Sequence, residues 1–477
     1  MHNRSVTRGT AGVIGSGPNG LSAGIVLAQA GYRVDVHEAA SSIGGAARSG
    51  ELTLPGFIHD LGSAVYPMAV SSPFFSKLPL GQHGLEWIWP QAAVAHPLDD
   101  GTAVLLERDL RETAAQFPSD AQSYRELFDP LVKNYATLFD EVFRPFRLPH
   151  HPLLMARFGA RAVQPATVFA RNRFRTARAR ALFAGIAAHS VSKLQSPLSA
   201  AFGLLLGAAG HRVGWPIPRG GAQQISNALA GVLHAAGGRI STNSRIAALD
   251  QLGGPEIAMC DVSPRQFVSI ANGKLPGPYR ESLEQYRYGL GVFKMDWALS
   301  EPIPWRAKEC RRAATIHLGG TLEEIAASES AAWYGEAPTN PYVLLAQPTL
   351  FDATRAPAGQ HTAWAYCHVP HGWRGSAVNQ IENQIERFAP GFRECILARR
   401  AHGPADLQKM NENLVGGDIV GGVIDPIQMV FRPTWRRYRT PLKGVYLCSA
   451  STPPGASVHG LCGYYAARWA LADGERR

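Results

Sequence analysis

The sequence predicts an α/β fold with a second, inserted α+β domain. Its 477 residues exceed what a single hydrophobic core usually organises. Hydrophobic residues make up 45% and charged residues 18% of the chain, which is a balance typical of globular proteins. A strand, a glycine-rich turn and a helix open the chain, and a similar order returns near its end. We therefore expect two domains, one of which interrupts the other.

The first element is a short apolar strand at 11–14. It leads through Gly15-Ser16-Gly17-Pro18-Asn19-Gly20 into a helix at 21–30. In such a G-x-G-x-x-G turn the first glycine allows the tight turn, the second admits a diphosphate, and the third packs the helix on the strand. The next strand ends at Glu38, whose carboxylate can bind ribose hydroxyls and disfavours a 2′-phosphate. The pattern predicts a Rossmann-type dinucleotide site at the helix N-terminus.

A second glycine pair follows this acid. Gly44-Gly45 allows another close backbone approach, and Arg48 could neutralise a phosphate. The alternative for Arg48 is an ordinary salt bridge. Near the other end of the chain, the strand 444–448 leads through the turn 453–460 into a helix that ends near residue 472. This helix N-terminus could face a partly negative group, or it could be a plain strand-to-helix loop.

The middle of the chain contains two kinds of pattern. Residues 70–212 are mostly helical, whereas 286–400 contain alternating stretches that predict an antiparallel sheet. Between them, a helix at 220–236 precedes a strand at 239–242. Lys294 and Asp296 share one face of a strand, either as a proton-transfer group or as a structural ion pair. Tyr366 and His368 share a face of another strand.

The composition argues against several classes of protein. The six cysteines contain no C-x-x-C pair, so neither a metal site nor a disulfide framework is expected. No run of about 18 uncharged apolar residues occurs, and a cytoplasmic location is expected. Only one dinucleotide fingerprint is present, which disfavours a second domain for NAD(P).

Charge is unevenly distributed along the chain. The net charge is +10, and the stretch between Glu141 and Asp250 holds no acid but 14 Lys or Arg. Seven arginines lie from Arg157 to Arg180, and Arg171, Arg175 and Arg178 are spaced for one helical face. The pattern predicts contact with an anionic membrane surface or an acidic partner; the alternatives are a solvated helix face and internal pairing with acids elsewhere in the chain. No nucleic-acid motif accompanies the charge, so nucleic acid is not expected as a partner, and oligomer formation is left open.

Taken together, these motifs resemble the phytoene desaturase-like flavoprotein family, in its phytoene dehydrogenase-related branch. The resemblance covers nearly the whole chain, and its further motifs are Phe57–Gly62, Pro218–Ala222, Gly291–Trp297, Asn413–Ile419 and Tyr446–Gly463. It implies non-covalent FAD on a discontinuous domain of the glutathione reductase/amine oxidase type, made of 1–70, 215–265 and 430–477. The substrate domain would comprise a mostly helical part, 71–214, and an antiparallel-sheet part, 266–429.

The resemblance also implies the chemistry. An apolar isoprenoid, polyene (carotenoid-like) or lipid-like substrate would pass a hydride to flavin N5. Lys294 and His459 are the catalytic candidates; for His459 the alternative is a backbone hydrogen bond in its loop. The residues expected to bind FAD are Gly15, Gly17, Pro18, Asn19, Gly20, Glu38, Ala39, Gly44, Gly45, Ala46, Arg48, Ala450, Gly455, Val458, His459 and Gly460.

Two features depart from the family pattern. Only Asp250–Met259 stands where the family has a longer β meander, and Ser457 stands where it often has glycine. Two other functions remain open: an FAD amine oxidase, and a flavin-binding membrane or assembly partner with little turnover.

Overall fold

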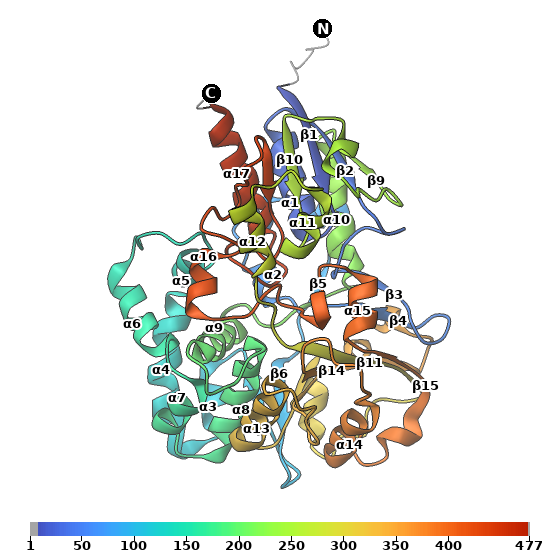
Figure 1. The fold of residues 1–477 in the computed structure, drawn as a ribbon. Helices are drawn as coiled ribbons and strands as arrows, with labels where there is room; N and C mark the ends of the chain where they lie inside the picture. Colours follow the sequence, from blue (N-terminus) through green and yellow to red (C-terminus); the bar gives the residue numbers. More distant parts are fainter. Residues whose placement is uncertain (1–7, 476–477) are drawn as a thin grey trace.

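The computed structural model describes residues 8–475 and contains two main sheets. The first sheet lies at the top of Figure 1 and is parallel throughout. Its order is β16 (Val445–Leu447), β10 (Ile257–Cys260), β1 (Gly9–Ile14), β2 (Tyr32–His37) and β9 (Arg239–Ser241). The strands come from three segments that lie far apart in the sequence. This is the α/β, Rossmann-type sheet that the sequence predicts.

Three helices cover this sheet: α1 (Pro18–Gln29), α10 (Gln223–Ala235) and α17 (Leu461–Glu475). α1 packs against both of the others. A Cβ added at Gly463 of α17 would lie 1.8 Å from the carbonyl oxygen of Asn19, so the two helices touch through their backbones. Small residues therefore bring the N-termini of α1 and α17 to the same edge of the sheet.

The connection between β9 and β10 is short. It contains a single 3-10 turn, Leu249–Leu252, and no strand. The structure thus has no β meander at this position, as the sequence departure predicts.

The second sheet has seven strands and lies at the bottom of Figure 1. Its order is β15 (Ile396–His402), β11 (Gly291–Leu299), β14 (His361–Val369), β13 (Val343–Ala346), β12 (Thr315–Leu318), β6 (Ala92–Pro97) and β7 (Ala103–Glu107). Every pairing is antiparallel except that between β12 and β6, which is parallel. β6 and β7 come from the segment expected to be mostly helical, so both inserted segments share this sheet.

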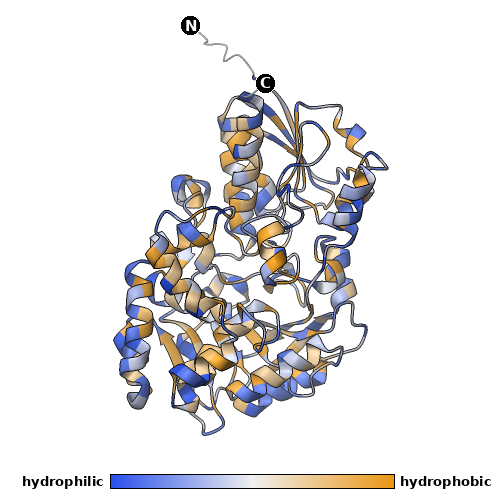
Figure 2. Cartoon of the chain, turned by 60° about the vertical axis from the view of Figure 1, so that its left-hand side comes forward, coloured by the Kyte–Doolittle hydropathy of each residue, from blue (hydrophilic) through white to orange (hydrophobic). Residues whose placement is uncertain are grey.

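The two faces of the second sheet are covered differently. One face packs against helices of the 71–214 segment, and the other packs against α14 (Val378–Phe388). Along β14, Trp364 belongs to the first core, whereas Ala363 and Ala365 belong to the second. In Figure 2 the strands are mostly orange, whereas the peripheral helices carry blue residues as well.

The other elements connect and cover these layers. The helices of the 71–214 segment are α2 (Pro67–Val70, just before it), α3 (Leu110–Ala115), α4 (Ala121–Lys133), α5 (Tyr135–Val142), α6 (Pro152–Ala162), α7 (Ala166–Arg173), α8 (Ala177–Ala187) and α9 (Ser199–Arg212). Later helices are α11 (Pro264–Ile270), α12 (Gly277–Glu284), α13 (Leu322–Trp333), α15 (Pro404–Met410) and α16 (Pro426–Phe431). Two small ribbons pair β3 (Ser49–Glu51) with β4 (Ile58–Asp60) and β5 (Trp87–Ile88) with β8 (Ile217–Pro218). None of the helices within residues 8–475 is both long enough and apolar enough to span a bilayer.

The prediction of one arginine-rich helical face is wrong. α7 ends at Arg173, Phe174 is extended, and α8 begins at Ala177. The Asp120 carboxylate accepts hydrogen bonds from the Arg175 N–H at 2.7 Å and from the N–H and hydroxyl of Thr176 at 2.7 and 2.5 Å. This remote acid holds the break between the helices, and the arginines on either side contact different segments: Arg171 bonds Glu323 of α13, whereas Arg178 bonds Thr102.

Candidate functional site

The turn after β1 carries the dinucleotide fingerprint. A Cβ on Gly20 would lie 2.1 Å from the Gly15 carbonyl oxygen, so the close approach of helix and strand requires glycine. Glu38, at the end of β2, accepts hydrogen bonds from the N–H and hydroxyl of Ser16 at 2.9 and 2.6 Å. Its other oxygen accepts from the Ala40 N–H at 2.8 Å, just beyond Ala39. The acid therefore lies beside the turn, where a ribose would meet it.

Asp261 lies at the same place and was missed by the sequence analysis. It follows β10, and its Oδ2 accepts a hydrogen bond from the Gly20 N–H at 2.9 Å. A Cβ on Gly17 would lie 2.7 Å from that oxygen. Burial raises the pKa of Asp261 to about 7; the Glu38 charge also raises it, and the Gly20 N–H opposes both. An acid directly after a strand that neighbours β1 is the signal that could have revealed it.

The second glycine pair lies against the first turn. The Gly44 N–H donates to the Ser16 carbonyl at 3.1 Å, and a Cβ on Gly45 would lie 3.2 Å from the Gly17 Cα. Arg48 donates to the carbonyls of Gly45 and Met410, each at 2.8 Å. Burial lowers the pKa of Arg48, and the nearby charge of Glu38 partly offsets this. Among the residues 8–475, no carboxylate lies within 4.0 Å of the Arg48 nitrogens, so the structure shows carbonyl partners there and not the salt bridge that was the alternative.

The C-terminal strip, residues 449–460, completes this edge. A Cβ on Gly460 would lie 2.3 Å from the Ser22 hydroxyl of α1, and one on Gly421 would lie 3.1 Å from the Ala450 Cβ. Val458 packs against the main core. Ser457 has φ +98°, a backbone conformation that favours glycine.

His459 is buried in this strip. Its Nδ1 accepts a hydrogen bond from the Leu461 N–H at 3.0 Å, at the start of α17. Burial lowers its pKa to about 4, so the ring is neutral at pH 7. Its Nε2 has no hydrogen-bond partner in the described chain, and the Phe143 ring meets it edge-on at 5.4 Å. The Nδ1 atom thus makes a backbone hydrogen bond, which was the alternative role for this residue, and Nε2 lies near the backbone of Gly455 and Ala456 without hydrogen-bond geometry to any described residue.

Lys294 and Asp296 form a buried ion pair on β11. The Lys294 Nζ lies 2.6 and 2.5 Å from the two carboxylate oxygens. Burial alone would raise the pKa of Asp296, but the charge of Lys294 and the His402 ring, whose Nδ1 lies 3.6 Å from the carboxylate, hold it below its ordinary value. His59 lies 3.7 Å from Asp296, yet burial lowers the His59 pKa to about 4, so this contact is not an ion pair at pH 7.

A row of rings follows the same sheet face beyond Lys294. Its members are Trp364, Tyr366, His368, Tyr342, His317 and His189, with successive ring centroids 5.0 to 6.3 Å apart. Lys294 Nζ lies 5.6 Å from the Trp364 centroid. Glu329 of α13 lies 2.7 Å from the His368 Nδ1, and the His368 Nε2 has no partner in the described chain. The sequence identified Tyr366 and His368 on this face but gave no sign of Glu329.

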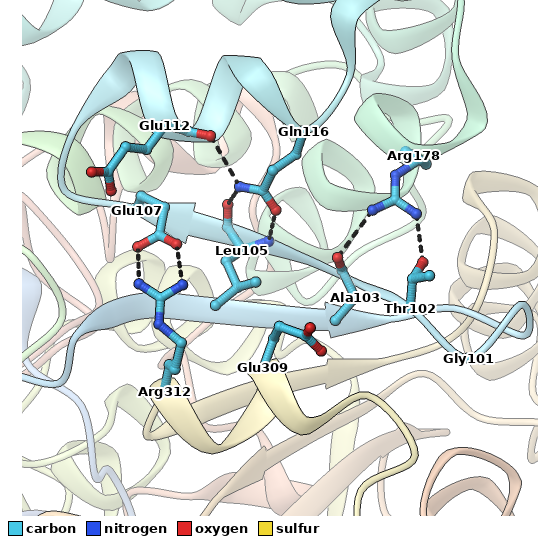
Figure 3. A pocket seen from close by; sticks show the side chains of 10 residues that line it. All are labelled: Gly101, Thr102, Ala103, Leu105, Glu107, Glu112, Gln116, Arg178, Glu309 and Arg312. Carbon is cyan, nitrogen blue, oxygen red and sulfur yellow. Dashed lines mark hydrogen bonds and ion pairs between the residues drawn. The ribbon is translucent and has the colours of Figure 1, made fainter.

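A separate surface pocket lies far from the glycine turns. Figure 3 shows this cavity of about 400 Å³ beside the β6–β7 hairpin. Arg312 bonds Glu107 at 2.8 and 3.1 Å, and Arg178 donates to the Thr102 hydroxyl at 2.6 Å. Its arginines are thus already engaged, and no residue expected to bind the dinucleotide lines it.

The glycine-lined edge fits an adenine dinucleotide. Only glycine fits at Gly17, Gly20 and Gly45, because a Cβ at each would press on Asp261, Gly15 or Gly17 at 2.7, 2.1 or 3.2 Å, so backbone alone lines the start of α1. The buried Asn19 Oδ1 at that end of the helix has no partner in the described chain. Backbone N–H groups of two helix starts face this edge, which suits a diphosphate and an electron-rich ring.

Comparisons with known proteins agree with this geometry. Residues 19–269 match the family described as flavin containing amine oxidoreductase. The rat protein named pyridine nucleotide-disulfide oxidoreductase domain-containing protein 2 is 25% identical, over 97% of this chain and 93% of its own length. A 4,4'-diapolycopen-4-al dehydrogenase of Metabacillus indicus is 30% identical, over 26% of this chain and 26% of its own length. An oxidoreductase structure from Methanosarcina mazei shares the fold with a TM-score of 0.62 and 16% identity, over 98% of this chain and 100% of that one.

The family match covers more than half of the chain, and it includes α1 from Asn19 onward, Glu38 and the parallel strands β2, β9 and β10. This chain is a member of the flavin-containing amine oxidoreductase family, and it is an FAD-dependent oxidoreductase.

Proposed function

We propose that FAD lies along the edge formed by β1, β2 and β16. Glu38 would hold the ribose, and the amides beside Gly17 and Gly45 would hold the diphosphate. Arg48 would add positive charge near the phosphates. The strip from Ala450 to Gly460 would contact the ring system. Bound FAD supplies the hydride acceptor, N5.

A matched pair of variants tests this placement. Gly17→Val brings side-chain atoms into the space beside Asp261 and should abolish FAD binding. Gly81→Val is the control, because a Cβ there meets nothing within 4 Å. Flavin absorbance of the purified proteins and the affinity of the apoprotein for FAD are the measurements. Gly17→Val protein that retains FAD as the control does would refute the placement.

We further propose that the substrate is an apolar molecule, such as a polyene or another isoprenoid, in keeping with the phytoene desaturase-like branch. The main support is the buried row of rings on the second sheet, which lines the face that carries Lys294 with aromatic side chains. The two acids on this face are engaged, since Asp296 pairs with Lys294 and Glu329 with His368. A dry, ring-lined site suits removal of a hydride from carbon.

Polar groups of this chain would have limited roles. The Lys294 Nζ already makes two contacts with Asp296, which leaves one N–H to orient a water molecule. His459 is neutral and its Nδ1 accepts from the Leu461 N–H, so its Nε2 carries the proton and could donate one hydrogen bond at the flavin edge. The His368 Nε2, oriented by Glu329, is a further candidate to take up a proton.

Anaerobic mixing tests the proposed substrate class. Holoprotein is mixed without oxygen with a partly saturated isoprenoid hydrocarbon in detergent micelles, and in parallel with monoamines and diamines. Bleaching of the oxidised-flavin band by the hydrocarbon alone is the expected result. Bleaching by amines alone would contradict the proposal and identify an amine oxidase. No bleaching by either class would leave a flavin-binding partner with little turnover as the better description.

The amine alternative finds less support in the ring geometry. An amine held between two rings needs a gap between them. Trp364 and Tyr366 stack nearly parallel, with centroids 5.8 Å apart and planes inclined by 15°. Rings at this separation are in direct contact, so no amine fits between them.

We also propose contact with an anionic membrane surface. Phe146 and Leu148 in the α5–α6 loop and Leu153 in the first turn of α6 are 64%, 90% and 75% exposed, and the exposed Arg147 and Arg157 are close to them in sequence. Exposed apolar side chains flanked by cations suit the surface of a bilayer. Three other arginines of the Arg157–Arg180 run are paired with acids: Arg171 with Glu323, Arg173 with Glu126 and Arg178 with Asp100. The membrane contact would therefore involve the N-terminal end of this run and the loop before it.

Vesicle flotation tests the membrane contact. The protein should float with vesicles that contain phosphatidylglycerol, and less with pure phosphatidylcholine. Leu148→Asp with Leu153→Asp should reduce flotation at least tenfold. Tyr334→Asp, at a residue 72% exposed, is the control and should float as the unaltered protein does. An unaltered protein that does not float with the anionic vesicles would refute the contact.

A further inference from the structure

Arg432 is a buried cation without an acidic partner. Within residues 8–475, three Lys or Arg side chains are buried: Lys294, Arg355 and Arg432. Lys294 has a carboxylate oxygen at 2.5 Å and Arg355 has one at 2.9 Å. Arg432 is 4% exposed, and no carboxylate of the described chain lies within 4.0 Å of its nitrogens.

Neutral groups hold the Arg432 guanidinium in place. Its Nη2 donates to the Gly421 carbonyl at 2.9 Å and lies 3.1 Å from the Tyr286 hydroxyl. Its Nε makes no hydrogen bond in the described chain. A Cβ on Gly455 would lie 2.6 Å from Nη1, so the guanidinium lies directly against the C-terminal strip.

The charge of Arg432 lowers the pKa of one nearby acid, Asp418, but the carboxylate oxygens of Asp418 already accept hydrogen bonds from backbone N–H groups. They accept hydrogen bonds from the N–H groups of Gly289, Val420, Gly421 and Gly422, at 2.8, 2.7, 3.1 and 2.8 Å. Burial raises the pKa of Asp418, these amides oppose the rise, and so does the charge of Arg432. Asp418 therefore fixes the loop that presents Gly421 and is not the direct counter-ion of Arg432.

A buried guanidinium without an anion in contact is costly, because buried charges in proteins are normally paired. The strip beside it is the one proposed above to contact the flavin ring. Reduction of FAD to its anionic form places negative charge on the N1–C2=O2 edge of that ring. We propose that Arg432 positions its positive charge at this edge and stabilises the reduced and other anionic states of the flavin.

The proposal rests on the flavin placement above but not on any substrate. It explains why a cation this deep in the chain is held by a carbonyl and a phenol and not by a carboxylate. It also explains the small residue at Gly455, since any side chain there would displace the guanidinium.

Sulfite provides a test that needs no substrate. Sulfite adds through its sulfur lone pair to flavin N5 and leaves the negative charge at N1–C2=O2, so its affinity reports a cation at that edge. Holoprotein, Arg432→Met and Arg432→Lys are titrated with sulfite. We expect at least tenfold weaker sulfite binding in Arg432→Met and less than threefold in Arg432→Lys. Arg436→Met is the matched control, because that guanidinium lies 4.9 Å above the ring of the exposed Trp435, and it should bind sulfite normally.

Anaerobic photoreduction gives a second readout. The unaltered protein should form the red, anionic semiquinone, and Arg432→Met should form the blue, neutral one. Sulfite affinity equal to that of the unaltered protein in Arg432→Met would overturn the proposal, as would a neutral semiquinone or no sulfite adduct in the unaltered protein. If Arg432→Met is folded but holds no FAD, the test rests on Arg432→Lys. A tenfold loss of sulfite affinity in that variant, which keeps the positive charge, would also overturn the proposal. Failure of every substrate to reduce the flavin would leave these results unaffected.

Discussion

The Oδ2 atom of Asp261 accepts a hydrogen bond from the Gly20 N–H at 2.9 Å, at the N-terminus of α1. A carboxylate thus occupies the helix end that would also bind the FAD diphosphate. Burial raises the pKa of this carboxyl to about 7, so near neutral pH it is divided between its two protonation states. Because two anions repel at close range, cofactor binding and protonation of Asp261 should be coupled.

The first prediction concerns the pH dependence of FAD affinity. Affinity should fall as pH rises from 6 to 8.5, because deprotonated Asp261 repels the diphosphate. Asp261→Asn keeps an oxygen for the Gly20 N–H and removes the charge. It should bind FAD about tenfold more tightly than the unaltered protein at pH 8, which corresponds to ~1.4 kcal/mol. Fluorescence titration of the two apoproteins with FAD measures their affinities at each pH. An affinity of the unaltered protein that does not change with pH would contradict the coupling.

The second prediction concerns the stability of the apoprotein against pH. The folded-state pKa of Asp261 lies above the ordinary aspartate value, so the folded state binds the proton more tightly than the unfolded state does. The contribution of Asp261 to the free energy of unfolding should therefore decrease as pH rises from about 4 to about 7, and should stay constant above that pH. Asp261→Asn should remove this decrease. Urea unfolding at a series of pH values is the measurement, with unaltered apoprotein as reference.

The third prediction concerns the contact between α1 and α17. Gly463→Ala would place a Cβ 1.8 Å from the Asn19 carbonyl oxygen and force the helices apart. We expect a loss of ~1–3 kcal/mol in stability together with weaker FAD binding. Gly474→Ala lies on the same helix, and its nearest neighbour would be the Tyr32 hydroxyl at 3.9 Å. That control should leave the thermal midpoint unchanged or raise it slightly; equal effects from the two variants would refute the backbone contact.

The fourth prediction separates a structural from a catalytic role for Lys294. Lys294→Met leaves Asp296 buried without its main partner and should cost ~3–5 kcal/mol of stability. Adding Asp296→Asn should restore part of that loss. If Lys294 serves the ion pair alone, flavin reduction in the double variant should proceed at the normal rate. A rate that stays low in a stable double variant would show that the Lys294 ammonium acts in the reaction.

The fifth prediction concerns Ser457. Its φ of +98° is a conformation that L side chains rarely adopt. Ser457→Gly relieves this strain but adds freedom to the unfolded chain, so we expect a net gain of ~1 kcal/mol. Differential scanning calorimetry of the holoprotein would measure it. Ser457→Ala, which keeps the strained φ, is the control and should bring no gain.

Local patterns in the sequence predicted the parallel sheet and one end of the site. The glycine turn, Glu38 and the strand patterns each lie within a few residues, so their chemistry can be read directly. Asp261, Glu329 and Arg432 are single residues brought to the site by packing, and no local motif marks them. The break between α7 and α8 has the same origin, because the acid that holds it, Asp120, lies more than 50 residues away.

β6 was missed for a different reason. A strand is recognised when buried and exposed residues alternate, but all six residues of β6 are buried. Its alanine-rich sequence, Ala92 to Pro97, is equally compatible with a buried helix. Only its neighbours in the sheet, β12 and β7, identify it as a strand.

The strand order of the parallel sheet has a consequence for biosynthesis. β10 lies between β16 on one side and β1 on the other, and these two strands are made near opposite ends of translation. The nascent chain therefore leaves one edge of β10 without a partner strand until the ribosome has nearly finished. Contacts so distant along the chain favour slow folding, and the flavin edge can form only once β16 and α17 have emerged. Added riboflavin during expression should therefore raise the yield of soluble protein by capturing chains that have just completed this sheet.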